Sequence, residues 1–268
     1  MLAWGAVGAV GALVFLVVLV GRSGPTPPSP SIGASPAAFV SASAQRTLAQ
    51  QTAEFTFSGT IQGSGQTSPA SGNGAINFTT NSMTLNIDIS VSGHSVVASE
   101  ILVGGTLYLR VAEDGRLLGR QWSRMPLGQS PTDLTDGDPF SELSLLAQHG
   151  ASVKSLGTKN IVGESCTGYA VTPSRSATLA WARPEIAKLG LSPAQASADL
   201  QYLQNSPPPT MTVWFDSHQL MREVSITVVS TSPDGSGPDG GQLVIDFTHY
   251  GVPVHITAPA SSDAVSET

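Results

Sequence analysis

The sequence predicts an α+β fold that is mainly β, built as one large curved antiparallel sheet with helices packed on one face. Residues 83–91, Met-Thr-Leu-Asn-Ile-Asp-Ile-Ser-Val, alternate apolar and polar side chains without a break, as in a strand with one buried and one solvated face. Several other segments repeat this pattern between turn residues. The helical segments do not alternate one by one with strands, which argues against a parallel sheet. A sheet this wide should twist and curl, and its inner side is a natural place for an apolar ligand.

The composition narrows the function classes. Only 12 % of the 268 residues are charged and the formal net charge is −7. Without a run of Lys and Arg, the chain lacks the electrostatic footprint of a nucleic-acid-binding protein, and the acidic balance gives no attraction to anionic lipid headgroups. Cys166 is the single cysteine, so an intramolecular disulfide and a cysteine-based zinc site are excluded. We expect Cys166 to be a small buried side chain.

The N-terminal residues predict attachment to a membrane. Residues 1–22 contain an apolar run that ends before Arg22, and about twenty helical residues span a bilayer. We interpret this stretch as a transmembrane anchor or a signal segment. The long run and the lack of a basic start favour an uncleaved anchor. The Pro/Ser-rich residues 23–35 are a linker, residues 36–260 the folded domain, and 261–268 a disordered tail.

The elements predicted for the first half follow from local patterns. Alanine is frequent over 36–54, which predicts a helix with Ser35 as its N-cap and Pro36 at its first position. The Gly/Ser-rich stretch 63–74 is predicted to be a turn region at a hairpin tip. Gly104 and Gly105 mark a second turn. Strands are predicted at 55–63, 74–80, 83–92, 95–104, 106–111 and 121–125, before a loop over 126–139.

The second half repeats strands around two helical regions. A helix is predicted from Phe140 to His149, ended by Gly150. A longer helical region over 178–205 is broken near 190–193. A polar turn is predicted over 230–241, and the tail after Pro259 is predicted to be disordered. Strands are predicted at 152–157, 160–171, 211–215, 224–228, 243–247 and 252–256.

The apolar positions of these strands form the candidate binding face. Alternation places them on one side of the sheet. An acyl chain could lie against them, because apolar burial is favourable by about 25 cal/mol per Å². The same side chains fit equally well an ordinary filled core. The candidate ligand-binding residues are Phe57, Ile61, Met83, Leu85, Ile87, Ile89, Leu107, Leu109, Val213, Phe215, Ile226, Ile245 and Phe247.

The sequence displays no catalytic or metal-binding pattern. Gly93-His94-Ser95 begins like an esterase nucleophile elbow, but a strand follows where that motif needs a helix. The histidines are scattered and form no His-x-His or HExxH spacing. The acidic residues on or beside strands, most of them on the polar face, are interpreted as solvated; they are Glu54, Asp88, Glu100, Asp216 and Asp246. We therefore predict no enzyme, no metal and no cofactor.

Taken in order, several segments resemble the actinobacterial LppX/LprG-type lipoproteins, relatives of the LolA-like lipid carriers. The middle strand Val-Gly-Glu-Ser-Cys-Thr-Gly-Tyr at 162–169 and Thr-Val-Trp-Phe-Asp at 212–216 carry much of the likeness. The resemblance covers about residues 36–265. The chain lacks the lipidated cysteine that follows the apolar run in this family. The other similar segments are 43–55, 105–110, Trp122, 246–254 and 258–259.

The resemblance implies a half-barrel sheet with helices across its concave side and an acylated lipid between them. It implies no cofactor and no catalytic residue. The expected function is an extracytoplasmic, membrane-tethered binding or carrier protein for envelope lipids or lipoglycans. A membrane transporter is a further candidate partner. The alternatives are a non-catalytic interaction or sensor module with a closed core, and a hydrolase of envelope lipids, for which Ser95 would have to be essential.

Overall fold

The computed structural model describes residues 35–63, 66–91, 93–117, 122–126, 151–188, 192–205, 210–231 and 238–266. The predicted membrane segment, the linker, the helix at 140–149 and nearly all of the predicted loop at 126–139 lie outside the described residues. Among the residues that are described, none belongs to a helix long and apolar enough to cross a membrane.

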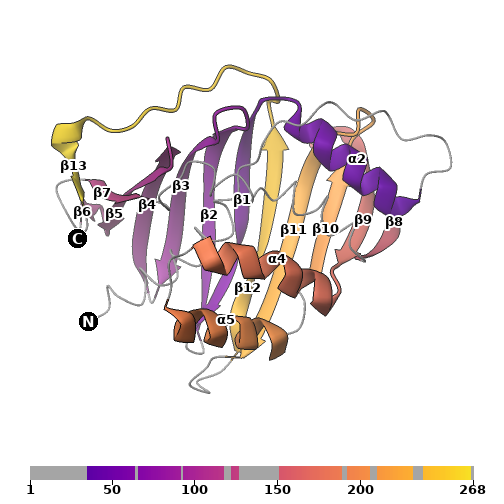
Figure 1. Ribbon diagram of the computed structural model, residues 1–268. Coiled ribbons are helices and arrows are strands. Elements are labelled where there is room, and N and C mark those ends of the chain that lie inside the picture. The colour runs from indigo at the N-terminus through magenta and orange to yellow at the C-terminus, as the bar shows by residue number, and fades with distance from the viewer. Residues whose placement is uncertain are drawn as a thin grey trace.

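The described residues form one 13-stranded sheet. Its order is β13-β7-β5-β4-β3-β2-β1-β12-β11-β10-β9-β8, with β6 paired to β5. The path has two free ends, so the sheet is open, and Figure 1 shows it as one curved layer. The predicted fold class is confirmed. The first strands are β1 (Thr52–Gly63), β2 (Gln66–Asn77), β3 (Ser82–Val91), β4 (His94–Val103), β5 (Thr106–Glu113), β6 (Arg116–Leu117) and β7 (Trp122–Pro126).

Pairing is antiparallel throughout these strands, except where β13 lies parallel to β7. At the middle of the sheet, β1 pairs with β2 on one side and with β12 on the other. The remaining strands are β8 (Ser152–Ile161), β9 (Glu164–Thr172), β10 (Thr210–Phe215), β11 (Met221–Thr231), β12 (Pro238–Thr248) and β13 (Ala264–Ser266).

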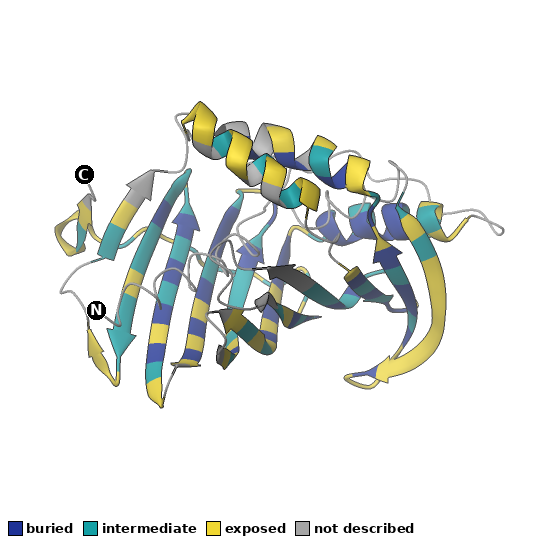
Figure 2. Cartoon of the chain, turned by 90° about the horizontal axis from the view of Figure 1, so that it is seen from below, coloured by how far each residue is buried: buried dark blue, intermediate teal, exposed yellow. Residues whose placement is uncertain are grey.

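Three helices lie on one side of the sheet: α2 (Pro36–Leu48), α4 (Arg175–Lys188) and α5 (Pro193–Asn205) (Figures 1 and 2). The N-cap of α2 is as predicted: the Ser35 Oγ accepts a hydrogen bond from the Ala38 N–H at 3.2 Å, and Pro36 starts the helix. A short 3-10 helix, Ser261–Asp263, precedes β13.

The alternation over 83–91 gives the predicted two-faced strand. Met83, Leu85, Ile87 and Ile89 are buried, whereas the side chains between them are exposed or half-buried. Figure 2 shows the same banding on the neighbouring strands. Because successive side chains of a strand point to opposite faces, one face of the sheet is apolar and the other is polar.

The prediction of a turn region over 63–74 was wrong, since β2 runs through it from Gln66 to Asn77. Gly72 and Gly74 suggested a loop, but they are needed inside the sheet. A Cβ at Gly72 would lie 2.5 Å from the Phe57 ring, and one at Gly74 would lie 2.5 Å from the Phe55 ring. The two glycines therefore leave room for aromatic rings of the adjacent strand, an exception to the usual depletion of glycine in strands.

Three boundaries also differ from the prediction. The first helix ends at Leu48 rather than 54, because Gln51 takes a positive φ of 69° and turns the chain into β1. The β8–β9 turn lies at Val162-Gly163, where the Asn160 side chain accepts a hydrogen bond from the Gly163 N–H at 2.9 Å. The stretch 230–241, predicted as a turn, is shortened because β11 extends to Thr231 and β12 begins at Pro238.

The C-terminal segment differs most from the structure predicted for it. Residues 252–256 alternate like a strand but have no strand partner among the described residues. The segment instead crosses to the far edge of the sheet, where β13 pairs with β7 (Figure 1). Residues 261–266 are therefore ordered, which corrects the predicted disordered tail. Pairing with an edge strand satisfies backbone groups that composition alone suggested were solvated.

Candidate functional site

The apolar face of the sheet is the candidate site. We use this name for the side of β1–β5 and β9–β12 that carries Phe55, Phe57 and Ile87. Most of the predicted ligand-binding residues belong to one buried apolar cluster; these are Phe57, Met83, Leu85, Ile87, Ile89, Val213, Phe215, Ile245 and Phe247. Ile61, Leu109 and Ile226 are partly buried and pack against that cluster, and Leu107 is buried. The structure thus gathers the predicted residues on one face, and their contact with a ligand stays a prediction.

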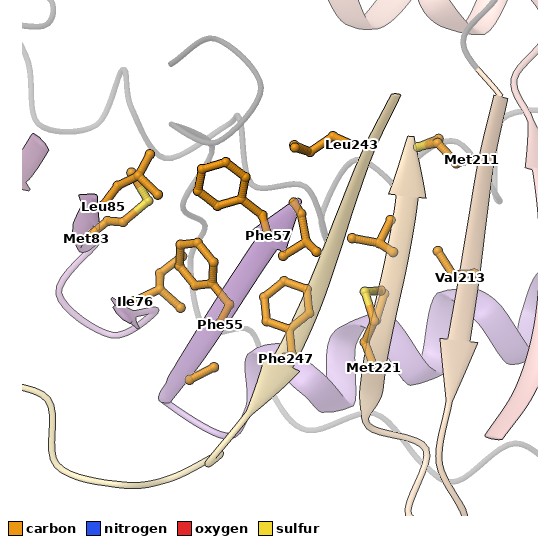
Figure 3. Packing of buried hydrophobic residues seen from close by; sticks show 14 of the residues in the cluster. Phe55, Phe57, Ile76, Met83, Leu85, Met211, Val213, Met221, Leu243 and Phe247 are labelled. Carbon is orange, nitrogen blue, oxygen red and sulfur yellow. The ribbon is translucent and has the colours of Figure 1, made fainter. Parts of the chain in front are cut away.

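Strand register makes this face continuous from one half of the sheet to the other. Phe57 of β1 is the central member of a row, opposite Gly72 on β2 and Ile245 on β12. Figure 3 shows side chains from β1, β12, β10 and β11 lying side by side along the same surface. The full row runs Val111, Ala98, Ile87, Gly72, Phe57, Ile245, Val224, Val213 and Tyr169.

Helix α2 covers the β8–β11 end of the apolar face. The Phe39 ring lies 5.2 Å from the Tyr169 ring and 5.9 Å from the Phe215 ring, measured between centroids. The Phe39–Phe215 contact is edge-to-face, an arrangement that aromatic quadrupoles favour. This end of the face is therefore a filled aromatic core.

Helix α4 lies over the middle of the sheet (Figure 1). Among its described side chains, Ala177, Thr178, Ala182 and Ile186 are buried, and the helix packs against α5.

Exposure varies along the apolar face. Met83 is 0 % exposed and Leu85 is 1 % exposed, so the part of the face on β3 is closed to solvent. Ile61 and Ile226, at one end of the strands, are partly exposed. Leu109 on β5 is also partly exposed. These partly exposed positions are where an apolar molecule could first meet the face.

The apolar face includes a buried acidic residue, Glu100, which was predicted to be solvated. Glu100 on β4 is 1 % exposed, and neither of its carboxyl oxygens has a hydrogen-bond partner among the described residues. Burial raises the pKa of this carboxyl from 4.5 to about 7. The signal was present in the sequence: Glu100 has the same strand parity as Val96, Ala98 and Leu102, which are buried.

Asp216, also interpreted as solvated, is buried for a structural reason. Its Oδ1 accepts hydrogen bonds from the backbone N–H groups of His218 and Leu220, and its Oδ2 accepts one from Arg222 Nε at 2.8 Å. These bonds shape the β10–β11 turn. Cys166 is buried as predicted, and burial raises the pKa of its thiol.

The candidate esterase motif lies in a hairpin between β3 and β4. Ser95 Oγ donates a hydrogen bond to Asp88 Oδ1 at 3.3 Å, and His94 Nδ1 lies 2.7 Å from Asp114 Oδ2. The serine hydroxyl and the histidine ring thus engage different carboxylates, although the Ser95 backbone N–H also donates to Asp114 Oδ1 at 3.0 Å. A strand rather than a helix follows them. In the described ranges, no group of His, Cys, Asp and Glu is placed so that it could hold a metal ion.

No protein-family model matches the chain, and no curated protein matches it. Among solved structures, it is similar to the lipoprotein LppX of Mycobacterium tuberculosis, with 14 % identity, a TM-score of 0.48, and coverage of 81 % of this chain and 98 % of that one. It is also similar to LprF from Mycobacterium bovis, with 12 % identity, a TM-score of 0.46, and coverage of 87 % and 100 %. LppX is of the family that the sequence resembles. At identities this low, the ligand of the chain has to be inferred from its own side chains.

Proposed function

We propose that the chain is an extracytoplasmic, membrane-tethered binding or carrier protein for acylated lipids or lipoglycans of the cell envelope. Residues 1–22 would attach it to the membrane and residues 23–35 would space the domain from the surface. A membrane transporter would be a second partner. No catalytic step is part of this proposal.

One observation carries the proposal: a continuous apolar face on one side of a single-layer sheet, with helices on that side. Ala177 and Ala182 of α4 are buried, and the strands offer Phe55, Phe57 and Phe247. An acyl chain placed between these layers would gain about 0.8 kcal/mol per buried CH₂ group. A lipid with two chains therefore needs no polar contact to bind tightly.

Uptake would begin at the partly exposed side chains. Ile61 and Ile226 lie at the same end of the strands, with Leu243 between their positions in the sheet. Because Met83 and Leu85 are closed to solvent, a ligand reaching β3 must displace the cover above it. The proposal thus requires the helices to move relative to the sheet on binding.

The closure at β3 favours a second candidate function. Leu85 and Ile87 are each 1 % exposed, as in a close-packed core with no ligand. In that case the domain would be a non-catalytic interaction or sensor module of the envelope, and its partner would bind the polar face or the sheet edge at β8.

Native mass spectrometry of the full chain, purified from an actinobacterial host in a mild detergent, tests the proposal. We expect a co-purified lipid mass that organic extraction removes and that added diacyl lipid restores. A bare protein mass with no lipid uptake would support the closed-core module instead.

A pair of variants separates binding at the apolar face from lipid adhering elsewhere. Ile61→Trp adds bulk where the face is partly exposed, whereas Thr60→Trp adds the same bulk at the preceding, exposed residue, on the opposite side of β1. We expect I61W to lose most of the bound lipid and T60W to retain it. Equal lipid content in the two variants would place the lipid outside the apolar face.

A further inference from the structure

Glu100 is a polar group set among apolar neighbours. Register places it between Leu85 on β3 and Leu109 on β5. Ala98 and Leu102 precede and follow it on the same side of β4. Its side chain therefore extends from the apolar face, in the row next to the one centred on Phe57.

Burying Glu100 at this position costs free energy that a purely structural role would not repay. A buried carboxyl without hydrogen bonds loses its interaction with water and gains nothing in return. Both of its oxygens lack a partner among the described residues, in contrast to Asp216, whose oxygens accept three hydrogen bonds. Buried polar groups in native proteins are nearly always satisfied, so an orphaned one points to a partner that binds.

The surroundings of Glu100 favour the protonated form of its carboxyl. Burial alone raises its pKa to about 7, with no contribution from a charged neighbour. The side chains that face it from β3 and β5, Leu85 and Leu109, cannot titrate. The nearest titratable residue on this side of β5, among the described residues, is Glu113, which lies opposite Val96.

We propose that Glu100 is the polar anchor of the apolar face and that its protonated carboxyl donates a hydrogen bond to the carbonyl oxygen of an ester-linked acyl lipid. This inference rests on the proposed function and adds to it the chemical class of the ligand. The ester group is the polar part of such a lipid that lies deepest among its chains, so it is the group that reaches an isolated donor on an apolar surface.

Other ligand groups suit this position less well. A phosphate would place a negative charge beside a carboxyl that lacks any positive neighbour. An amine would require the carboxyl to ionise, and an ion pair buried among leucines costs much of what it gains through desolvation. A plain hydrocarbon would leave both oxygens unsatisfied. The neutral ester carbonyl accepts one hydrogen bond and brings no charge.

The test compares binding of radiolabelled dioleoylglycerol with that of its dialkyl ether analogue, which lacks the ester carbonyls. The full chain in detergent micelles is titrated with each at pH 5.5. We expect wild type to bind the diester about five- to tenfold more tightly than the diether, the effect of about one hydrogen bond. Glu100→Leu should bind the two equally, and Glu100→Gln, which keeps an N–H donor, should retain the preference.

The pH dependence gives a second readout that does not rely on E100L folding. At pH 8.5 the wild-type preference should disappear, because the ionised carboxyl no longer donates, whereas the E100Q preference should stay constant. Asp88→Asn, on the polar face of β3, should behave as wild type at both pH values. The same ester preference in E100L as in wild type, or a wild-type preference that does not change with pH, would overturn the role of Glu100 while leaving lipid binding intact. Failure of wild type to bind either lipid would overturn the proposed function, and this inference with it.

Discussion

The hydroxyl oxygen of Thr47 accepts a hydrogen bond from the backbone N–H of Met221 at 3.0 Å, which joins helix α2 to strand β11. The same hydroxyl donates to the Ser43 carbonyl one helical turn earlier, at 2.9 Å. Thr47 and Met221 are each 0 % exposed. A single side chain therefore fixes the last turn of α2 to the edge of the apolar face.

Replacing Thr47 by valine should lower the free energy of unfolding by about 1–3 kcal/mol, because the buried Met221 N–H loses its acceptor while the side-chain volume is kept. Urea unfolding followed by circular dichroism measures the change.

Thr178→Val is the matched control. Thr178 in α4 is also buried, and its hydroxyl also donates to a carbonyl four residues earlier, that of Ser174, at 3.2 Å. This bond is local and does not join the helix to a strand. Its replacement should cost less than that of Thr47. Equal losses for the two variants would mean that the bond to Met221 adds no stability.

The stability of the ligand-free protein should fall as the pH rises through the range from about 4.5 to about 7. The pKa of Glu100 is higher in the folded state, about 7, than its ordinary value of 4.5, so the folded state binds the proton more tightly than the unfolded state does. Below pH 4.5 both states are protonated and the carboxyl has no effect. Between the two values the unfolded state ionises first, and the accumulated loss above pH 7 is about 3 kcal/mol.

Glu100→Gln removes this titration. We expect the variant to be less dependent on pH than wild type and more stable than wild type at pH 8, by urea unfolding at matched ionic strength. If the two proteins lose stability in parallel between pH 5 and pH 8, Glu100 is not the group responsible.

Gly72→Ala should destabilise the fold by about 1–3 kcal/mol through overpacking. Its Cβ would lie 2.0 Å from the Asn86 carbonyl oxygen and 2.5 Å from the Phe57 ring, and the backbone of a central strand cannot retreat. The neighbouring variant Asn73→Ala alters the exposed face of the same strand and should be nearly neutral. Thermal unfolding of the two variants distinguishes them, and an unchanged melting temperature for G72A would contradict the placement of the Phe57 ring.

Ending the chain after Asp263 should expose the β7 edge. The pairs between Ala264, Val265 and Ser266 of β13 and Trp122, Ser123 and Arg124 of β7 would be lost. Hydrogen–deuterium exchange should then show faster exchange in β7 and little change in β1 or β12. The full-length Val265→Ala variant, which keeps the backbone pairing, should retain the protection of β7. Unchanged exchange in the truncated protein would show that β13 does not protect that edge.

The alternation of side chains sufficed to predict the sheet and most of the apolar face. Leu85, Ile87, Phe215 and Phe247 could be assigned to one face because successive side chains of a strand point to opposite faces, which is a local property. The face also collects residues from distant strands only because those strands pair in register. The order of the strands, with β1 beside β12, depends on contacts between the two halves of the chain that no local pattern records.

The wrong predictions have physical causes. Gly72 and Gly74 predict a turn because glycine permits turns, yet here a ring from β1 fills the space above each of them. The C-terminal strand β13 is only three residues long and lies in a mostly polar tail, and its pairing with β7 makes it a strand. Glu100 was interpreted by its charge rather than by its place in the alternation. In each case the residue type predicted its usual environment, and contact with residues distant in the sequence placed it in a different one.

The pairing of β1 with β12 has a consequence for how the chain folds. From β1 to β5 and from β8 to β12, each strand pairs with its neighbour in sequence, so each half can form largely from pairs of successive strands, with α4 and α5 inserted between β9 and β10. The seam between the halves joins residues such as Glu54 and His249, which are 195 positions apart. Closing so long a loop is entropically expensive and slow. Until the seam closes, β1 and β12 both present unpaired edges beside exposed phenylalanines, so aggregation competes with folding at this step.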